Sequence, residues 1–200
     1  MPSYAITGAA RGLVYFEFVN QLSTDSGNTV FALVRNEATA NKLKELGRHN
    51  VHIIEADITD NKALKYAAAE VSRLGGNSLD YLINNAGSSE ELLTKDLLDS
   101  NGKAKKVVTV TSGLGDLDMT IAAELVTSWT IPPSRKPRAP TEKELEQFKA
   151  MVEKFRKVYP DFTGPITPEA SVRMQLEVIN RITVNDTGAF ISHKGNKEWL

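Results

Sequence analysis

The first half of the chain alternates short apolar segments, rich in β-branched residues, with segments of helical periodicity. The predicted strands are 4–7, 29–34, 51–55, 79–84 and 106–111, and the predicted helices between them are 12–22, 37–46, 61–74 and 89–98. Strands that are apolar along nearly their whole length are typical of a parallel sheet covered on both faces, and the intervening helices supply the crossovers that parallel strands require. This alternation predicts a doubly wound α/β fold.

The alternation breaks near residue 113, so the predicted sheet is incomplete in its C-terminal half. Segment 128–140 contains four prolines, which remove backbone donors and restrict the residues before them. We interpret it as a linker or surface loop within a single domain that spans residues 1–200. Its three cations, Arg135, Lys136 and Arg138, indicate a solvated loop rather than a targeting patch.

Two helices and a short strand are predicted after this loop. Thr141 and Glu144 form a capping box for the first helix, and Thr167 and Pro168 fit the N-cap and first position of the second. The expected apolar faces are Leu145, Phe148, Val152, Phe155 and Tyr159 on the first helix, and Val172, Leu176, Ile179 and Ile182 on the second. We expect both faces to pack onto a core, and residues 188–193 to form the last strand.

Composition favours a protein that acts on small molecules. The 24 basic and 25 acidic residues give a net charge of -1, so no overall field attracts nucleic acid or an anionic membrane. The absence of cysteine excludes disulfides and thiolate nucleophiles and suits a reducing compartment. No apolar run approaches the roughly 20 residues of a membrane helix, so we expect a cytoplasmic protein. His49 and His52 lack further ligands at metal-site spacing, and no metal is predicted.

The first predicted strand runs directly into a glycine-rich turn, Thr7-Gly8-Ala9-Ala10-Arg11-Gly12-Leu13. Gly8 permits a tight turn, and Gly12 lets the backbone approach a pyrophosphate at the N-terminus of the next helix, where unpaired N–H groups and the helix dipole favour anions. This context is typical of the dinucleotide-binding Rossmann fold. Glycines alone would be weaker evidence, because turns recruit glycine for conformational reasons.

The end of the second predicted strand is where such folds contact the adenosine ribose. An acidic residue there accepts a hydrogen bond from the 2′-hydroxyl of NAD, whereas a cation favours the 2′-phosphate of NADP. The sequence has Arg35 at this position, and Arg11 in the glycine turn can add a second positive charge. We therefore predict NADP as the cofactor; the alternative is that both arginines are ordinary surface residues.

Four segments, in order, resemble the short-chain dehydrogenase/reductase family. They are the glycine turn, Glu55-Ala56-Asp57-Ile58, Asn84-Asn85-Ala86-Gly87 and Val110-Thr111-Ser112-Gly113. The tail from Gly164 is similar to small fungal-type carbonyl reductases of this family, so the resemblance covers residues 1–118 and 160–200. It implies an oxidoreductase that acts on a small carbonyl compound or alcohol. By position it assigns Gly8, Gly12 and Leu13 to the pyrophosphate, Asp57 and Ile58 to the adenine, Asn85, Ala86 and Gly87 to the nicotinamide-side ribose, and Ser112 to the substrate carbonyl.

Departures from the family pattern concern catalysis above all. The family base is a Tyr whose pKa is lowered by a Lys four residues later, because a nearby cation stabilises phenolate. No Tyr-x-x-x-Lys occurs in the sequence. Val14 stands where the family usually has a third glycine, which predicts weaker cofactor binding. The family's sixth strand and the long helices through which its dimers pair also have no counterpart, so the usual oligomer is not expected.

Three interpretations remain open at this point. The chain is an active NADP-dependent reductase in which another acid, such as Tyr159, replaces the missing tyrosine; it is a catalytically silent protein that binds NADP or a partner; or it is an internally truncated product of a reductase gene. The sequence does not identify a substrate, because the segments that select substrates in the family are the ones removed.

Overall fold

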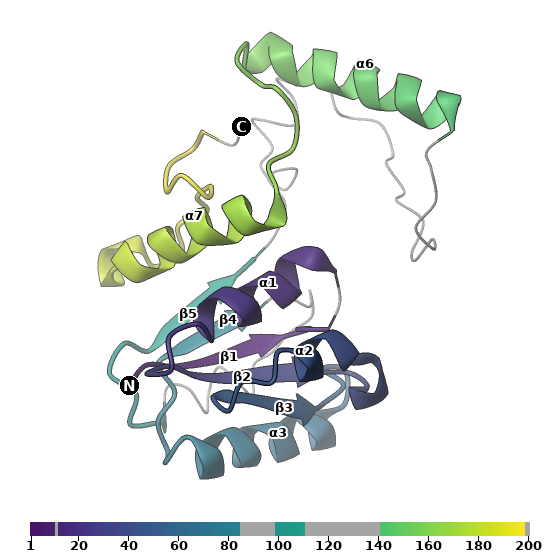
Figure 1. Cartoon of the computed structure of the whole chain (residues 1–200). Helices are drawn as coiled ribbons and strands as arrows, with labels where there is room; N and C mark the ends of the chain where they lie inside the picture. The colour runs from purple at the N-terminus through teal and green to yellow at the C-terminus, as the bar shows by residue number, and fades with distance from the viewer. Residues whose placement is uncertain (11, 85–98, 111–140, 199–200) are drawn as a thin grey trace. The chain divides into compact units, whose positions relative to one another are not determined.

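The computed structural model describes residues 1–10, 12–84, 99–110 and 141–198. Contacts divide the chain into two compact units, Met1–Thr111 with Thr167–Ala189, and Ser112–Ile166 with Phe190–Leu200. The first unit holds a five-stranded parallel sheet in the order β3-β2-β1-β4-β5 (Figure 1). Its strands are β1 Ser3–Thr7, β2 Thr29–Val34, β3 Val51–Glu55, β4 Tyr81–Asn84 and β5 Lys106–Thr109. This is the predicted doubly wound arrangement, and the prediction of the fold class is confirmed.

Helices cover both faces of the sheet. On one face, α1 (Leu13–Leu22), α2 (Asn41–Glu45) and α7 (Pro168–Arg181) bury an apolar cluster that includes Phe18, Leu43 and Val172. On the other face, α3 (Asn61–Leu74) packs with Leu64 and Val71 inward. Successive strand residues alternate between the two clusters, as a pleated strand requires: Tyr4 and Ile6 contribute to the first, and Ala5 to the second.

Several sequence predictions match the structure closely. Strands 29–34 and 51–55 and helix 61–74 have the predicted bounds. The Thr167 hydroxyl accepts from the Ala170 N–H at 3.2 Å, as an N-cap should, and Pro168 is the first residue of α7. Val172 and Ile179 of α7 are buried and Leu176 packs against the same cluster, which confirms these positions of the predicted inward face, whereas Ile182 follows the end of the helix. The prediction for helix 89–98 lies outside the described residues.

Two predictions of secondary structure are wrong. Segment 37–46 forms a short 3-10 helix, η1 (Glu37–Thr39), and then α2, because the Asn36 side chain and the Glu37 carbonyl stabilise a separate turn before Ala40. Residues 188–193 form no strand. Their backbone instead makes local bonds, with the Ser192 N–H donating to Asn196 and the Gly195 N–H to Ser192, so no ladder is available to them in the described structure. Another 3-10 helix, η3 (Val184–Asp186), precedes this segment.

The second unit contains α6 (Glu142–Val158). Phe155 is buried and meets the edge of Phe162 at 5.2 Å between ring centroids, with Tyr159 packed beside them. Leu145 and Phe148 are exposed, so the expectation that the whole apolar face is covered holds only for its C-terminal part. The single-domain prediction for residues 1–200 stays a prediction. No helix of the described ranges combines the length and apolar character needed to cross a membrane.

The start of the sheet is held by a buried carboxylate. Asp80 Oδ2 accepts from the Ser3 N–H and the Ser3 hydroxyl, each at 3.0 Å, and Oδ1 accepts from the N–H groups of Lys103 and Ala104 at 2.6 and 3.2 Å. Burial alone would raise the pKa of Asp80, but the backbone hydrogen bonds from Ala104, Ser3 and Lys103 outweigh it and lower the pKa below its usual value. Asp80 therefore joins the starts of β1 and β4 to the segment that leads into β5.

Replacing Asp80 by Asn should destabilise the protein by about 2 to 4 kcal/mol at neutral pH, because the amide cannot accept all of these bonds and adds an N–H group among donors. Urea unfolding followed by circular dichroism measures the change. The lowered folded-state pKa means that the stabilisation is present above the unfolded pKa of about 3.9 and is lost as pH falls through the folded value. The wild-type advantage should therefore shrink below about pH 4, whereas exposed Asp161→Asn should change stability little at any pH. An unchanged unfolding midpoint for Asp80→Asn would contradict this role.

Candidate cofactor site

The carboxyl ends of the parallel strands form one edge of the sheet. From β1 the chain builds outward to β2 and β3, then returns to place β4 on the other side of β1. Crevices at such a reversal of strand order are where ligands bind in open α/β sheets. The turn after β1 and the end of β4 flank this point, and the ends of β2 and β3 extend the edge to one side (Figure 1).

The glycine turn has the backbone that the sequence predicts. Gly8 and Gly12 have φ of 69° and 79°, in the region that favours glycine. Gly12 also has ψ of 163°, a conformation that is almost confined to glycine. A Cβ built on Gly12 would lie 3.5 Å from the Tyr15 ring, an ordinary contact, so the backbone angles rather than lack of space require glycine here. The Ala9 N–H donates to the Leu33 carbonyl at 3.0 Å and ties the turn to β2.

The N-terminus of α1 is open to an anion. No side chain caps it at Gly12, and its first turn contains no acidic residue. The first N–H groups of a helix lack partners within the helix, and the helix dipole places partial positive charge at the same end. Leu13 begins the helix, and Val14 is half-buried against the core cluster. Arg11 lies outside the described residues.

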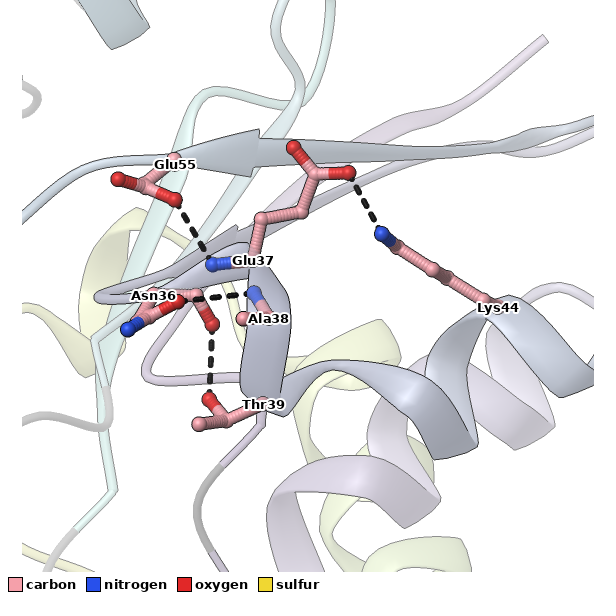
Figure 2. Close-up of polar contacts among 6 residues, drawn as sticks. All are labelled: Asn36, Glu37, Ala38, Thr39, Lys44 and Glu55. Atoms are coloured by element: carbon pink, nitrogen blue, oxygen red, sulfur yellow. Dashed lines mark hydrogen bonds and ion pairs between the residues drawn. The ribbon is translucent and has the colours of Figure 1, made fainter.

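The segment after β2 carries the predicted ribose-reading residue. Arg35 is exposed, and no hydrogen bond or ion pair engages its guanidinium within the described parts of the chain. Figure 2 shows the turn that follows: Asn36 Oδ1 accepts from the Ala38 N–H at 2.8 Å, and the Thr39 hydroxyl donates to the Asn36 carbonyl at 2.7 Å. Two acidic side chains lie near this turn, and both have partners. Glu55 accepts from the Glu37 N–H at 2.8 Å, and Glu37 pairs with Lys44 at 2.8 Å.

The segment after β3 contains the two residues assigned to the adenine. Asp57 Oδ1 accepts from the Thr59 N–H at 2.9 Å and from the Thr59 hydroxyl at 2.8 Å, which closes a local turn. Ile58 is half-buried and packs against the cluster under α3. The Ala56 N–H donates to the Val34 carbonyl at 2.8 Å, so β2 and β3 remain paired up to this edge. Asp57 and Ile58 therefore lie on the same edge as the glycine turn and Arg35.

At the end of β4, Asn84 Oδ1 is buried without a hydrogen-bond partner in the described structure. A buried carbonyl oxygen left in this state costs free energy, so an unpartnered acceptor at a ligand-binding edge indicates a position where a donor is expected. The Asn84 backbone carbonyl is paired, because it accepts from the Val110 N–H at 2.7 Å. The predicted site residues Asn85, Ala86, Gly87 and Ser112 lie outside the described residues.

Comparisons with known proteins agree with this geometry. The sequence model of the short chain dehydrogenase family matches residues 3–122. The chain belongs to this family. It is 36% identical to the short-chain dehydrogenase/reductase atnB of Arthrinium sp and 34% identical to the short chain dehydrogenase virK of Hypocrea virens, with all of both chains covered in each case.

A solved structure shows the family fold as well. The chain matches a crystal structure described as a carbonyl reductase, Sniffer, of Caenorhabditis elegans with a TM-score of 0.52 and 25% identity, over 61% of this chain and 68% of that one. The alignment with atnB extends over 271 positions, more than the 200 residues of this chain, so atnB has residues with no counterpart here. Members of this oxidoreductase family bind a nicotinamide cofactor, and the chain carries the family's fold at reduced length.

The described part of the site fits such a cofactor. The positive-φ glycines and the uncapped start of α1 suit a pyrophosphate, and Arg35 follows β2 with a guanidinium that has no partner among the described residues and suits a phosphate. The buried oxygen of Asn84 supplies an acceptor on the other side of β1. No group of three or more His, Asp or Glu side chains that could hold a metal ion occurs in the described ranges.

Two tyrosines of the sheet, Tyr4 and Tyr81, lie at the amino ends of the strands, opposite to the edge formed by the carboxyl ends. Tyr4, Tyr81 and Lys106 are cross-strand neighbours at the amino ends of their strands, with the two rings stacked at 4.6 Å and Lys106 Nζ 5.6 Å from the Tyr81 ring centre. Tyr4 precedes Thr7 by three residues, about 10 Å along a strand. Burial raises the pKa of Tyr4 to about 12, with Tyr81 and Asp80 adding to the effect, and burial and Asp80 also raise the pKa of Tyr81. Neither phenol is placed to act as a base at the carboxyl ends of the strands, which are called the cofactor edge below.

The other tyrosines have different surroundings. Tyr15 is half-buried beside Gly12 on α1, and Tyr66 is exposed on α3. Tyr159, the residue considered as a replacement acid, belongs to the second unit, where it packs with Phe155. Sequence reasoning gives no role to Asn36, Glu55 or Asn84. An Asn directly before a short helical turn is a common cap, which is a signal for Asn36, whereas the roles of Glu55 and Asn84 depend on strand register.

Gly12→Ala should lower stability by about 1 to 3 kcal/mol and weaken binding of a nicotinamide dinucleotide, because the added Cβ opposes the φ and ψ that expose the α1 N–H groups. Gly47→Ala is a matched control, since Gly47 has a positive φ of 59°, nothing within 4 Å of an added Cβ, and a position after α2. The control should lose stability without losing cofactor affinity. Thermal melts and calorimetric titration measure the two effects. Equal cofactor affinities in Gly12→Ala and Gly47→Ala would count against a phosphate-binding turn.

Proposed function

We propose that the chain is an NADP-binding member of the short chain dehydrogenase family that reduces or oxidises small carbonyl compounds or alcohols only very slowly. The observation that carries the choice of NADP is the state of the charged groups after β2. Arg35 is exposed and unengaged among the described residues, while the two nearby carboxylates already have partners. Glu37 and Glu55 each already hold one donor through a single carboxylate oxygen, and the Arg35 cation remains to receive a 2′-phosphate.

The proposal extends the family resemblance to the other residues. Gly8, Gly12 and Leu13 would present backbone N–H groups to the pyrophosphate, with Arg11 adding charge beside Arg35. Asp57 and Ile58 would contact the adenine, and Asn85, Ala86 and Gly87 the nicotinamide-side ribose. The bound nicotinamide supplies or accepts a hydride. Ser112 would donate a hydrogen bond to the carbonyl oxygen of the substrate.

Slow chemistry is expected because proton transfer has no evident acid. The sequence has no Tyr-x-x-x-Lys. The described tyrosine that lies under a lysine, Tyr81, is on the sheet edge away from the cofactor side and has a raised pKa. General acid catalysis typically contributes about 10²- to 10⁴-fold to rate, so its loss leaves binding intact and removes most of the turnover.

A second candidate is a catalytically silent protein that binds NADP, or a partner, without turnover. The same absence of Tyr-x-x-x-Lys favours it, and a truncated gene product would share this feature. These candidates agree on the cofactor edge and differ in whether any hydride transfer is measurable. For the candidates that bind a cofactor, the expected small-molecule partner is NADP.

Arg35→Ala should weaken NADPH binding by roughly one to two decades and leave NADH binding nearly unchanged, because one charge-assisted contact contributes about 1.5 to 3 kcal/mol. Titration followed by protein fluorescence or calorimetry gives both affinities. Arg73→Ala is the control: it also removes an arginine from the surface, but from the end of α3, where Arg73 pairs with Glu70. If the unmodified protein binds NADPH and NADH equally, the choice of NADP is wrong.

NADPH consumption with a panel of quinones and ketones should be undetectable or several orders of magnitude below a typical turnover of about 10 s⁻¹. Absorbance at the NADPH band over long incubations measures it, with Ser112→Ala as the variant that separates site chemistry from background decay. Turnover at an ordinary rate that disappears in Ser112→Ala would contradict slow chemistry and would indicate an efficient enzyme with a substitute acid.

A further inference from the structure

The backbone on either side of Arg35 is anchored to β3. Before it, the Val34 carbonyl accepts from the Ala56 N–H at 2.8 Å. After it, the Glu37 N–H donates to Glu55 Oε2 at 2.8 Å (Figure 2). Glu55 is the last residue of β3 and stands opposite Val34 in the strand register. Contacts from Glu55, the last residue of β3, and from Ala56, which follows it, thus bracket the backbone of Arg35 and Asn36.

The other hydrogen bonds of the turn are local, and its packing contact with the sheet is made by Ala40, which is buried in the core cluster directly after the turn. Asn36 Oδ1 accepts from the Ala38 N–H, and the Thr39 hydroxyl and N–H donate to the Asn36 carbonyl at 2.7 and 3.1 Å. The ion pair between Glu37 and Lys44 joins the turn to α2 between two side chains that are each about half exposed, at 48% and 50%. Such exposed pairs contribute little. The contact from Glu55 is the one in Figure 2 that joins the turn to the sheet.

We infer that Glu55 is a positioning residue for cofactor discrimination: by holding the Glu37 N–H it fixes the turn from which Arg35 projects toward a ribose 2′-phosphate. This inference rests on the proposed function, since it concerns how the same site distinguishes NADPH from NADH. Glu55 itself does not contact the phosphate in this account. It acts through the backbone, and its contribution should appear in the affinity for NADPH and hardly at all in the affinity for NADH.

Two effects of Glu55, its charge and its hold on the turn, predict opposite changes in NADPH affinity when the side chain is removed. A carboxylate near the site repels a phosphate, so if charge were all that mattered, removing Glu55 would strengthen NADPH binding. If Glu55 positions the turn, removing it frees the Glu37 amide and the Arg35 backbone, and NADPH binding weakens. A neutral side chain that can still accept a hydrogen bond, as glutamine can, should retain the anchor.

The experiment compares Glu55→Ala, Glu55→Gln and Glu37→Gln with the unmodified full chain. Glu37→Gln removes one negative charge from the same turn but leaves the backbone N–H that Glu55 binds. NADPH and NADH affinities are measured by titration, and exchange of the Glu37 amide hydrogen is measured by NMR without cofactor. Glu55→Ala should weaken NADPH binding about 3- to 10-fold and speed amide exchange, whereas NADH affinity should change less than about 2-fold. Glu55→Gln should lie near wild type in each respect, and Glu37→Gln should bind NADPH as well as wild type or better.

The outcomes separate this inference from the proposed function. Unchanged or tighter NADPH binding in Glu55→Ala, in a protein that prefers NADPH, overturns the positioning role alone. Unchanged exchange of the Glu37 amide in Glu55→Ala overturns it too, because the anchor would then not hold the turn. A wild-type protein that binds neither cofactor, or both equally, overturns the proposed function and with it any part for Glu55 in discrimination. The exchange data on the free protein would then still decide whether Glu55 fixes the turn.

Discussion

The carboxylate of Asp80 holds together the three segments that meet at the start of the sheet. It binds the first residue of β1, precedes β4 directly, and receives two N–H groups from the segment before β5. Because the strands are parallel and paired in register, fixing their starts also fixes where their carboxyl ends lie. The cofactor edge is therefore determined partly at the opposite edge of the sheet. A buried carboxylate with this many donors is stable in its charged form, which explains why the network withstands burial.

The features proposed to bind a cofactor lie apart from the Tyr and Lys that resemble a catalytic pair. The glycine turn, Arg35 and Asn84 lie at the carboxyl ends of the strands. Tyr81 and Lys106 lie at the amino ends, where the Lys106 ammonium also donates to the carbonyls of Ile179 and Asn180 at 2.9 Å each and closes the end of α7. Their contact is a structural one: it packs α7 on the sheet. Tyr81 and Lys106 therefore contact each other at the end of the sheet opposite to the proposed cofactor site.

The sequence predicted well those features that are set by residues close together in the chain. Strand 29–34 is apolar after Thr29, strand 51–55 is apolar except at His52 and Glu55, and helix 61–74 starts at an Asp60 cap that accepts from Lys62, so their bounds follow from neighbouring residues. The glycine turn and Arg35 follow from their places after the first two strands. Segment 37–46 was harder, because the cap at Asn36 forms a separate 3-10 turn within a helical pattern.

Features that depend on distant partners could not be read in the same way. A strand at 188–193 needs a neighbour to pair with, and its own hydrophobic pattern does not reveal that the residues form turns instead. Phe148 is on the apolar face of α6 by periodicity, yet whether that face is covered depends on what packs against it. Glu55 and Asp80 act through strand register, which brings residue 55 beside residue 37 and residue 80 beside residue 3. In the sequence alone they are two acids at the ends of predicted strands.

The proposed function requires that Arg35, on the same edge as the turn of Gly8 and Gly12, binds the 2′-phosphate of a nucleotide. The most direct measurement is a calorimetric titration of the purified chain with 2′,5′-ADP and with 5′-AMP, which differs from it only in lacking the 2′-phosphate. These fragments report on the adenosine end of the site without requiring the nicotinamide end or any turnover. 2′,5′-ADP should bind at least about tenfold more tightly, with a preference that falls as salt is added. Equal affinity for the two fragments, or no binding of either, would contradict it.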